Sequence, residues 1–244
     1  GSRVMIMLDD MPLLRPDAGR PMWNFIPMED VEQVDIMKGA ASVVFGSSAL
    51  TGAINVLTAY PRPKPKTKVT AFAGVYSKPK DEREASWNHR NPVKYGLSFL
   101  HSRIIKKNFD LVVGGEFFND EGYIGPEEKL FETRNNNGST KGKYEIRGRL
   151  NFATRFRFNK VKGLTLSLNG NFMYTQNAQS FFWNDGFENK YRSYKGSLSY
   201  FKDFTFYIDP TLRYISPRGF THSLKNRIIY SDNAELSGAQ SARS

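Results

Sequence analysis

The feature that most constrains this chain is a strict two-residue alternation over residues 143–159. The apolar positions are Tyr144, Ile146, Gly148, Leu150, Phe152, Phe156 and Phe158, and the polar positions between them are Glu145, Arg147, Arg149, Asn151, Arg155 and Arg157. A β-strand places alternate side chains on opposite faces, so the segment predicts a strand with one apolar and one polar face. An ordinary strand has about 5–6 residues. This one is long enough to cross a bilayer while tilted.

Six further segments alternate in the same way. The predicted strands cover 67–77, 93–103, 108–119, 143–158, 163–176, 204–215 and 219–231. Tight turns at 106–107, 159–162 and 217–218 alternate with long polar connections at 78–92, 120–142 and 177–203. Short turns at one end and long loops at the other are typical of outer-membrane barrels. The sequence therefore predicts a transmembrane antiparallel β-barrel, and the alternative is a soluble β-barrel or sandwich.

Composition agrees with a barrel and excludes other classes. The mean hydropathy of −0.52 excludes a bundle of membrane helices, and no uncharged apolar run reaches the length of about 18 residues that such a helix needs. The net charge of +11 is spread along the chain, so we expect solvated faces and no nucleic-acid partner. The absence of cysteine excludes disulfides and thiolate metal sites.

The predicted strand count does not make a closed barrel. Bacterial barrels have even numbers of strands, and an open sheet would leave two bare edges in lipid. No signal peptide precedes the strand pattern of 4–8. We therefore expect the chain to be a fragment, cut at both ends.

The first 60 residues differ from the rest. Short apolar strand patterns at 4–8, 31–37 and 53–58 surround a proline-rich loop at 11–27, a brief turn at Glu29-Asp30, and a small-residue segment, 40–48, which could hold one helical turn. Prolines 61, 63 and 65 alternate with basic residues and predict a stiff linker. We expect an N-terminal domain over 1–60, a linker over 61–66 and a barrel portion over 67–244.

Residues 31–56 carry a family resemblance. The run V-E-Q-V-D-I-M-K-G at 31–39, followed by A-S-V-V-F-G at 41–46 and G-A-I-N-V at 52–56, resembles the C-terminal half of the plug domain of TonB-dependent outer-membrane receptors. The loops and the exit at Ala59-Tyr60-Pro61 look most like receptors of the Bacteroidota. Departures from the family pattern are Asp10, Gln33, Ala40 and Phe45.

The resemblance implies an all-β chain with a small α+β plug portion, containing about seven strands of a plugged barrel of about 22. It further implies capture of a ligand from outside, with transport driven by the TonB complex through an N-terminal TonB box. The implied location is the bacterial outer membrane, with lipid and lipopolysaccharide around the barrel and, as a further possible partner, a surface lipoprotein.

Charged residues predict how a plug would be held. Arginines on the polar face of 143–158 must point inward, because a charge facing lipid at mid-depth costs about 2–4 kcal/mol. We hypothesise that some of them contact plug carboxylates, with water and loop contacts as the alternative. The residues concerned are Arg147, Arg149, Arg155 and Arg157 on the barrel and Glu29, Glu32 and Asp35 on the plug.

The ligand is expected at the plug apex and the long loops. In the resembling family the apex maps onto Phe45, Gly46, Ser47 and Ser48, with packing in the plug core as the alternative for Phe45. Trp23 is a further candidate, although local packing is the simpler interpretation. Loop aromatics and a histidine (Trp87, His89, Tyr123, Trp183 and Tyr191) are candidates that interface-belt or loop packing would equally explain.

The favoured function is import of a scarce nutrient, with a ferric siderophore first and glycan, peptide or cobalamin as alternatives. A non-transporting barrel (adhesin or signalling receptor) and a barrel-embedded hydrolase are the other classes. An enzyme is disfavoured because no G-x-S-x-G or phosphate loop is present and the three histidines fit no metal motif. We expect no catalytic residue, no metal ligand and no cofactor.

Overall fold

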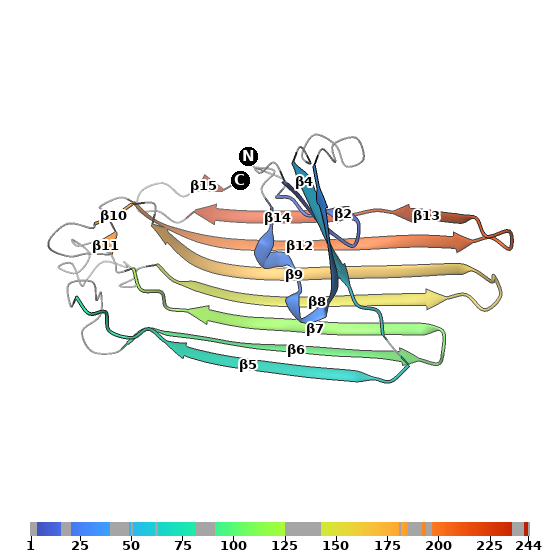
Figure 1. Cartoon of the computed structure of the whole chain (residues 1–244), viewed down its shortest axis with the longest axis horizontal. Coiled ribbons are helices and arrows are strands. Elements are labelled where there is room, and N and C mark those ends of the chain that lie inside the picture. Colours follow the sequence, from blue (N-terminus) through green and yellow to red (C-terminus); the bar gives the residue numbers. More distant parts are fainter. Residues whose placement is uncertain are drawn as a thin grey trace.

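A computed structural model describes residues 4–15, 21–39, 49, 51–61, 63–81, 91–124, 143–180, 182–184, 192–193, 197–235 and 242–243. These residues form two main sheets, and the first crosses over the second in the view of Figure 1. The first, called the small sheet, has the strand order β2-β1-β4-β3 and consists of β1 (Val4–Leu8), β2 (Met11–Pro12), β3 (Val31–Lys38) and β4 (Gly52–Thr58). The strands β1 and β4 pair in parallel, and the other pairs are antiparallel.

Two 3-10 turns connect β2 to β3. They are η1 (Trp23–Phe25) and η2 (Met28–Asp30), and η2 is the brief turn predicted at Glu29-Asp30. Among the described residues no helix is long and apolar enough to cross a membrane. The predicted helical turn within 40–48 lies outside the described residues.

The second sheet, called the long sheet, is an antiparallel meander with the order β15-β14-β12-β9-β8-β7-β6-β5, and β13 also pairs with β12. Short hairpins connect its strands at one end, here called the turn end, and the longer connections lie at the other, the loop end (Figure 1). Its strands are β5 (Lys66–Val75), β6 (Val93–Ile105), β7 (Phe109–Asp120), β8 (Glu145–Arg157), β9 (Leu164–Ser180), β12 (Leu198–Ile215), β13 (Thr221–Lys225), β14 (Ile228–Glu235) and β15 (Ala242–Arg243). A two-residue hairpin, β10 (Trp183–Asn184) with β11 (Arg192–Ser193), stands apart at the loop end.

Every predicted long strand is present, and most limits agree within two residues. The strand predicted to end at 176 continues to Ser180. The strand predicted to begin at 204 begins at Leu198. The last predicted strand, 219–231, is divided into β13 and β14, which both pair with β12. The division lies opposite Pro210, which has no N–H to donate to the ladder.

The two faces of the long sheet differ as the alternation predicts. On β8, Leu150 is 59% exposed on the outer face, whereas its neighbour Arg149 is 3% exposed on the face toward the small sheet. The outer face also carries a row of stacked rings from β8 to β14, formed by Phe152, Phe172, Phe206 and Tyr230 with centroids 5.4–6.3 Å apart. An apolar aromatic outer face and a polar inner face are the arrangement of a membrane barrel wall.

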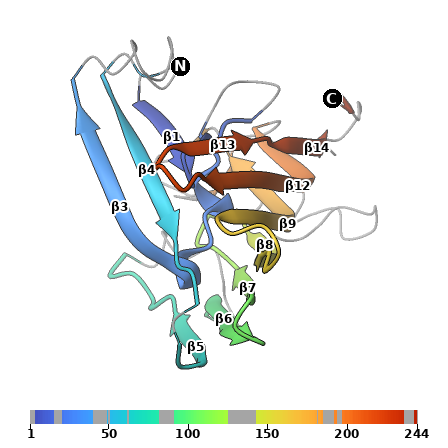
Figure 2. The same cartoon turned by 90° about the vertical axis from the view of Figure 1, so that its right-hand side faces the viewer.

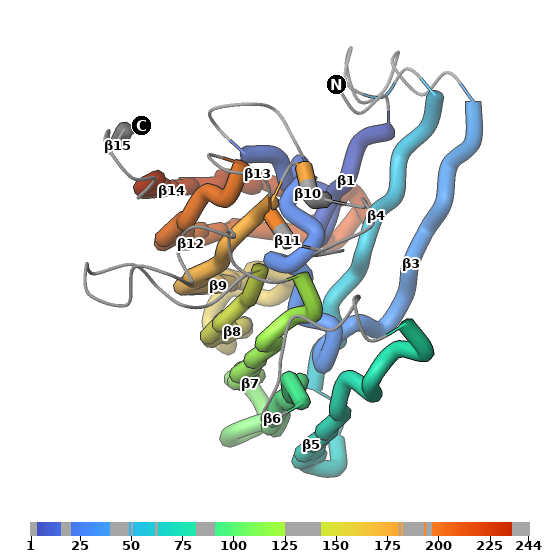
Figure 3. Tube along the Cα trace, turned by 90° about the vertical axis from the view of Figure 1, so that its left-hand side faces the viewer, coloured from blue at the N-terminus to red at the C-terminus, as the bar shows by residue number. Residues whose placement is uncertain are grey.

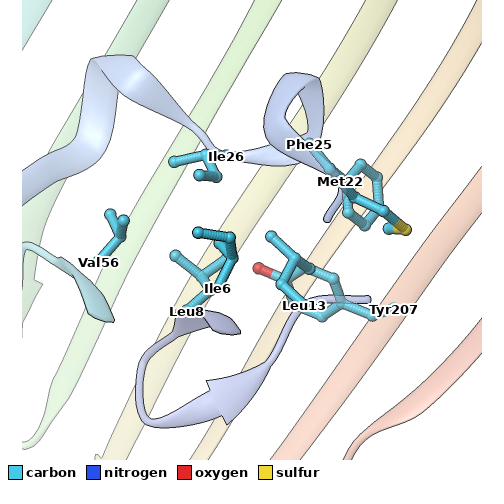
Figure 4. Close-up of a cluster of buried hydrophobic side chains, with 8 residues drawn as sticks. All are labelled: Ile6, Leu8, Leu13, Met22, Phe25, Ile26, Val56 and Tyr207. Atoms are coloured by element: carbon cyan, nitrogen blue, oxygen red, sulfur yellow. The ribbon is translucent and has the colours of Figure 1, made fainter. Parts of the chain in front are cut away.

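The main core lies between the sheets. Ile6, Leu8 and Val56 of the small sheet pack with Leu13, Met22, Phe25 and Ile26 of the connecting loop and with Tyr207 of β12 (Figure 4). Phe25 and Tyr207 meet edge to face, with ring centroids 5.4 Å apart. The long sheet curves so that the small sheet lies on its concave side (Figure 3). Tyr207 is therefore a residue of the long sheet whose side chain packs in the same core as the small sheet.

Candidate functional site

Arg149 joins the two sheets at the centre of their interface. Its Nη2 lies 2.5 Å from Glu29 Oε2 on η2 and 2.7 Å from Glu116 Oε2 on β7. Its Nη1 donates to the main-chain oxygens of Ile26 (2.6 Å) and Asn24 (3.1 Å). The guanidinium thus neutralises one carboxylate from each sheet and caps two carbonyls of the connecting loop. Since a buried charge is stable only when its hydrogen bonds are satisfied, these partners fix the loop against β8.

A closed ring of polar contacts continues from Arg149. The second oxygen of Glu116 accepts from Arg147 Nη2 at 3.0 Å, and Arg147 Nη1 reaches Glu145 Oε1 at 2.6 Å. Glu145 Oε1 also accepts from Asn24 Nδ2 at 3.4 Å, and the main-chain oxygen of Asn24 returns to Arg149. We call these five residues the polar ring. Four belong to the long sheet and one to the loop beside the small sheet, so neither part can move without breaking it.

Two buried amides extend the same interface. Asn171 on β9 is fully buried and donates from Nδ2 to the main-chain oxygen of Phe25 at 2.6 Å. Asn151 on β8 satisfies its neighbours when its amide nitrogen donates to Glu29 Oε1 (2.8 Å) and to the Gly114 oxygen (3.2 Å). Both oxygens of Glu29 are then bound by the long sheet. The long sheet therefore binds the loop that connects β2 to β3 through the main-chain oxygens of that loop and through the Glu29 carboxylate.

A second attachment lies where β13 and β14 are divided. Arg227 pairs with Asp209 of β12 through Nε–Oδ1 (2.8 Å) and Nη2–Oδ2 (2.5 Å). The same guanidinium donates to the carbonyls of Pro12 (2.8 Å), Met11 (3.2 Å) and Leu8 (3.3 Å). It thus holds the β1–β2 hairpin by its backbone. Sequence reasoning missed this residue, and the available signal was a proline within the predicted strand opposite it.

The β1–β2 turn itself is built from two acidic residues. Asp9 and Asp10 have φ of +52° and +66°, the left-handed pair that a tight two-residue hairpin needs. Lys225 Nζ lies 2.5 Å from Asp10 Oδ2, and this hydrogen bond, helped by Asn55, holds the pKa of Asp10 below its usual value. Asp9 instead accepts from the Thr58 amide at 2.9 Å, and burial raises its pKa.

The other two predicted arginines pair within the long sheet. Arg155 and Arg157 both contact Asp110 Oδ2 of β7, at 2.5 Å and 2.6 Å. Arg155 also stacks over the ring of Tyr60, with Cζ 4.0 Å from the centroid, so it reaches the end of the small-sheet region through an aromatic face. The carboxylate that compensates these arginines is therefore one that sequence reasoning did not consider.

The three predicted plug carboxylates behave differently from one another. Glu29 meets Arg149, as described above. Glu32 is exposed and lines a cavity of about 860 Å³ at the turn end, together with Arg155 and Arg157. Asp35 accepts from Gln33 Nε2 at 2.6 Å, and no ion pair joins it to an arginine within the described residues. The reason is strand order: β3 is the strand of the small sheet farthest from β12 (Figure 2).

A second cavity, here called the loop-end cavity, has a volume of about 420 Å³. It lies at the loop end of the long sheet and shares Asn24 and Glu145 with the polar ring. Its lining is rich in phenol, amide and carboxylate groups: Asn24, Tyr76, Asp120, Gly122, Tyr123, Lys143, Tyr144, Glu145, Asn177, Ala178, Gln179 and Ser180. Tyr76 donates to Asp120 Oδ1 at 2.9 Å. The cavity at the turn end is larger, but this one lies at the loop end, where a ligand is expected, and it is the candidate ligand site there.

Most predicted ligand contacts lie outside the described residues. Phe45, Ser47 and Ser48, with Gly46, lie outside the described residues, as do Trp87, His89 and Tyr191 and the side chain of Trp183. Trp23 is 55% exposed on η1, next to Asn24, and it lines two smaller hollows beside the loop-end cavity. Tyr123 lines that cavity. Among the described residues, no group of three or more histidine, aspartate or glutamate side chains is arranged to hold a metal ion.

Comparison with known proteins gives a consistent result. The sequence profile of the TonB-dependent Receptor Plug Domain family matches residues 1–53. The chain is 27% identical over 107 residues to the ferric enterobactin receptor PirA of Pseudomonas aeruginosa, covering 39% of this chain and 14% of that protein. It is 25% identical over 71 residues to the vitamin B12 transporter BtuB of Photobacterium profundum, covering 29% and 12%. These relatives are transport receptors, not enzymes.

A solved structure extends the likeness through the long sheet. The ferric yersiniabactin uptake receptor FyuA of Yersinia pestis aligns with 98% of this chain and 33% of its own, with a TM-score of 0.68 and 16% identity. The predicted fold, plug sequence followed by strands of a plugged barrel, is therefore confirmed. The chain spans about 12–14% of the length of the curated relatives it matches. Residues 1–53 thus carry the plug sequence of TonB-dependent receptors, and the chain has the fold of such receptors of the bacterial outer membrane.

Proposed function

We propose that this chain is part of a receptor that imports a scarce nutrient across the outer membrane, with a ferric siderophore as the favoured cargo. The observation that carries the proposal is the chemistry of the interface between the small sheet, as the plug, and the long sheet, as the barrel wall. Arg149, Arg227 and Asn171 hold the plug mainly by hydrogen bonds to its backbone. Water can replace such bonds when the plug shifts, because their net contribution is about 0.5–1.5 kcal/mol each.

The cargo assignment is supported by the relatives. PirA is described as a ferric enterobactin receptor and FyuA as a ferric yersiniabactin uptake receptor. BtuB, described as a vitamin B12 transporter, supports cobalamin as the second candidate. The partners in this proposal are the TonB complex, acting through a TonB box, the small nutrient, lipid and lipopolysaccharide around the wall and a surface lipoprotein.

The domain division is part of the same proposal. We assign residues 1–60 to the plug, 61–66 to the linker and 67–244 to the barrel. In the structure β4 ends at Thr58 and β5 begins at Lys66, so the connection between the two sheets spans 59–65; its overlap with 61–66 supports the proposed division.

The ligand assignments are likewise proposals. Phe45, Ser47, Ser48 and Trp23 are assigned to the ligand side of the plug. Trp23→Ala in the full-length receptor is expected to weaken binding by roughly tenfold, because an aromatic anchor at a site contributes about 1–3 kcal/mol. Phe220→Ala is the matched control, since Phe220 is 65% exposed at the turn end.

The function is tested by uptake. The full-length receptor would be expressed in a bacterium that lacks its own siderophore receptors, and accumulation of radioactive iron supplied as ferric siderophores would be measured. Accumulation that requires a working TonB complex is the expected result. Surface binding without accumulation would instead identify a non-transporting receptor, and uptake of labelled cobalamin alone would move the assignment to the second candidate.

A further inference from the structure

The loop-end cavity is built from both parts of the receptor. Asn24 enters it from η1, and Glu145 enters it from the first residue of β8. Both residues belong to the polar ring, so the ring fixes the floor of the cavity before any ligand arrives. A solute in this cavity would touch plug and wall at once. Its surface chemistry must therefore complement groups that are already held in place.

The charged groups that line the cavity are mostly negative. Asp120 and Glu145 contribute carboxylates, and Lys143 is the one basic side chain among the described lining residues. Asp120 accepts from the phenol of Tyr76 and from the amide of Gly122 (2.8 Å), contacts that hold its carboxylate in place in the lining. The lining therefore offers hydrogen-bond acceptors with a negative balance.

Nearby cations do not reverse this balance. The Arg147 side chain is 11% exposed, is shared between Glu116 and Glu145, and lines the hollow on the other side of the ring. Lys94 Nζ lies 3.5 Å from Asp120 and is not among the lining residues. The basic groups of the wall are thus paired with its own carboxylates. The described lining of the cavity therefore presents two carboxylates and one ammonium group to a solute.

The aromatic lining points the same way. Tyr76 and Tyr123 stand with ring centroids 5.9 Å apart, and Tyr144 also lines the cavity. Phenol faces attract cations and pack against C–H surfaces, and they repel anions, because the ring quadrupole is negative on its face. Amides from Asn177 and Gln179 add adaptable hydrogen bonds.

We infer that the loop-end cavity binds a solute surface that is neutral or cationic and rich in hydrogen-bond donors. This inference rests on the proposed siderophore function, and it names the class of siderophore that the receptor takes. Iron(III) held by three hydroxamates carries no net charge, because each ligand loses a single proton. Iron(III) held by three catecholates stays triply negative, because each ligand loses two. The receptor therefore prefers the hydroxamate class, and most of all one that bears a free ammonium group.

The test uses two defined probes with the purified full-length receptor in detergent micelles. Ferrioxamine B is a ferric trihydroxamate with a free ammonium, and the ferric complex of a synthetic hexadentate tris-catecholamide is the anionic counterpart. Dissociation constants would be measured by calorimetry at several salt concentrations. The expected result is at least about tenfold tighter binding of ferrioxamine B, with a preference that shrinks as salt screens the carboxylates.

Variants tie the preference to the cavity. Asp120→Asn is expected to reduce it severalfold. Gln179→Lys adds a cation without touching the polar ring and is expected to raise the affinity for the tris-catecholamide. Asp232→Asn on β14, which is not among the residues lining the cavity, is the matched control and should leave the ratio unchanged.

Each outcome is decisive. Equal or tighter binding of the anionic probe, with TonB-dependent uptake intact, overturns the charge preference and leaves the import function standing. If the preference for ferrioxamine B is the same in Asp120→Asn and in Gln179→Lys as in the unaltered receptor, the ligand does not bind in this cavity. Failure of both probes to bind overturns the inference together with the siderophore assignment.

Discussion

Arg149 and Glu29 form an ion pair between the plug and the wall, with Nη2 and Oε2 2.5 Å apart and the two side chains only 1% and 4% exposed. A buried pair of this kind is costly to break from one side, because the remaining charge is left without compensation. Its placement at the centre of the interface makes it the attachment on which plug docking depends most.

Arg149→Ala should therefore loosen the plug by about 3–5 kcal/mol, since Glu29 and Glu116 would both be left buried and charged. The measurement is amide hydrogen exchange across residues 21–30 of the full-length receptor in micelles. Arg157→Ala is the matched control: its side chain is 35% exposed, and Asp110 would keep Arg155. Equal loss of protection in both variants would show that Arg149 has no special role.

The polar ring should make its members energetically dependent on one another. Glu145→Gln and Glu116→Gln, two ring members that share Arg147, are expected to show a coupling energy of about 0.5–3 kcal/mol in a double-mutant cycle. Glu145→Gln combined with Asp209→Asn is the comparison pair, because Asp209 belongs to the separate Arg227 attachment. Additivity in both pairs would mean that the ring is a set of independent contacts.

Removal of Arg227 should free the β1–β2 hairpin. Arg227→Ala leaves Asp209, which is 6% exposed, charged and unpaired, at an expected cost of about 3–5 kcal/mol. Asp209→Asn in the same chain should recover part of that cost, because a neutral amide is cheaper to bury. Limited proteolysis within 9–15 reports the change. Arg213→Ala changes an exposed residue of β12, the strand of Asp209, and its proteolysis within 9–15 should equal that of the unaltered receptor.

Plug docking should also depend on pH through Asp30. This carboxyl is 3% exposed, and its Oδ1 has no hydrogen-bond partner within the described residues. Burial, reinforced by Asp9, Glu29 and Glu32, raises its pKa from 3.8 to about 8. The folded plug therefore binds a proton that the unfolded chain releases, so stability is greatest below pH 3.8 and falls as the pH rises toward 8.

Asp30→Asn should remove this contribution. Its stabilising effect relative to the native residue is expected to grow between pH 4 and pH 8 and then to level off. The check is the unfolding midpoint of the plug at a series of pH values, followed by exchange of residues 28–31. A constant difference across the range would show that Asp30 is already ionised when the plug is docked.

The inward direction of Arg147 and Arg149 could be predicted from sequence because the two-residue period is local to the strand. The outward exposure of Leu150 follows from the same rule. The limits of the strands were harder to predict. Pro210 interrupts the pairing between β12 and the last predicted strand, and its effect depends on which residues lie opposite it in the sheet. Arg227 was missed for this reason.

The partners of the charged residues were the least predictable part. Asp35 was expected to face the wall, but the order β2-β1-β4-β3 places its strand at the far edge of the plug sheet. Asp110 satisfies Arg155 and Arg157 from the neighbouring strand, and this requires the register of β7 against β8. Such contacts depend on strand order and on the register between strands, and the hydrophobic period of a single segment predicts neither of these.

The parallel pairing of β1 with β4 has a mechanical consequence. Val4 lies opposite Gly52 and Leu8 opposite Val56, so tension applied to the backbone ahead of Val4 acts along the strand and loads all of its hydrogen bonds in shear. At the far end of β1, Arg227 donates a hydrogen bond to the Leu8 carbonyl and pairs with Asp209 of β12, so force on β1 is transmitted to β12. The path of a pull through this plug therefore runs lengthwise along one strand and into the wall.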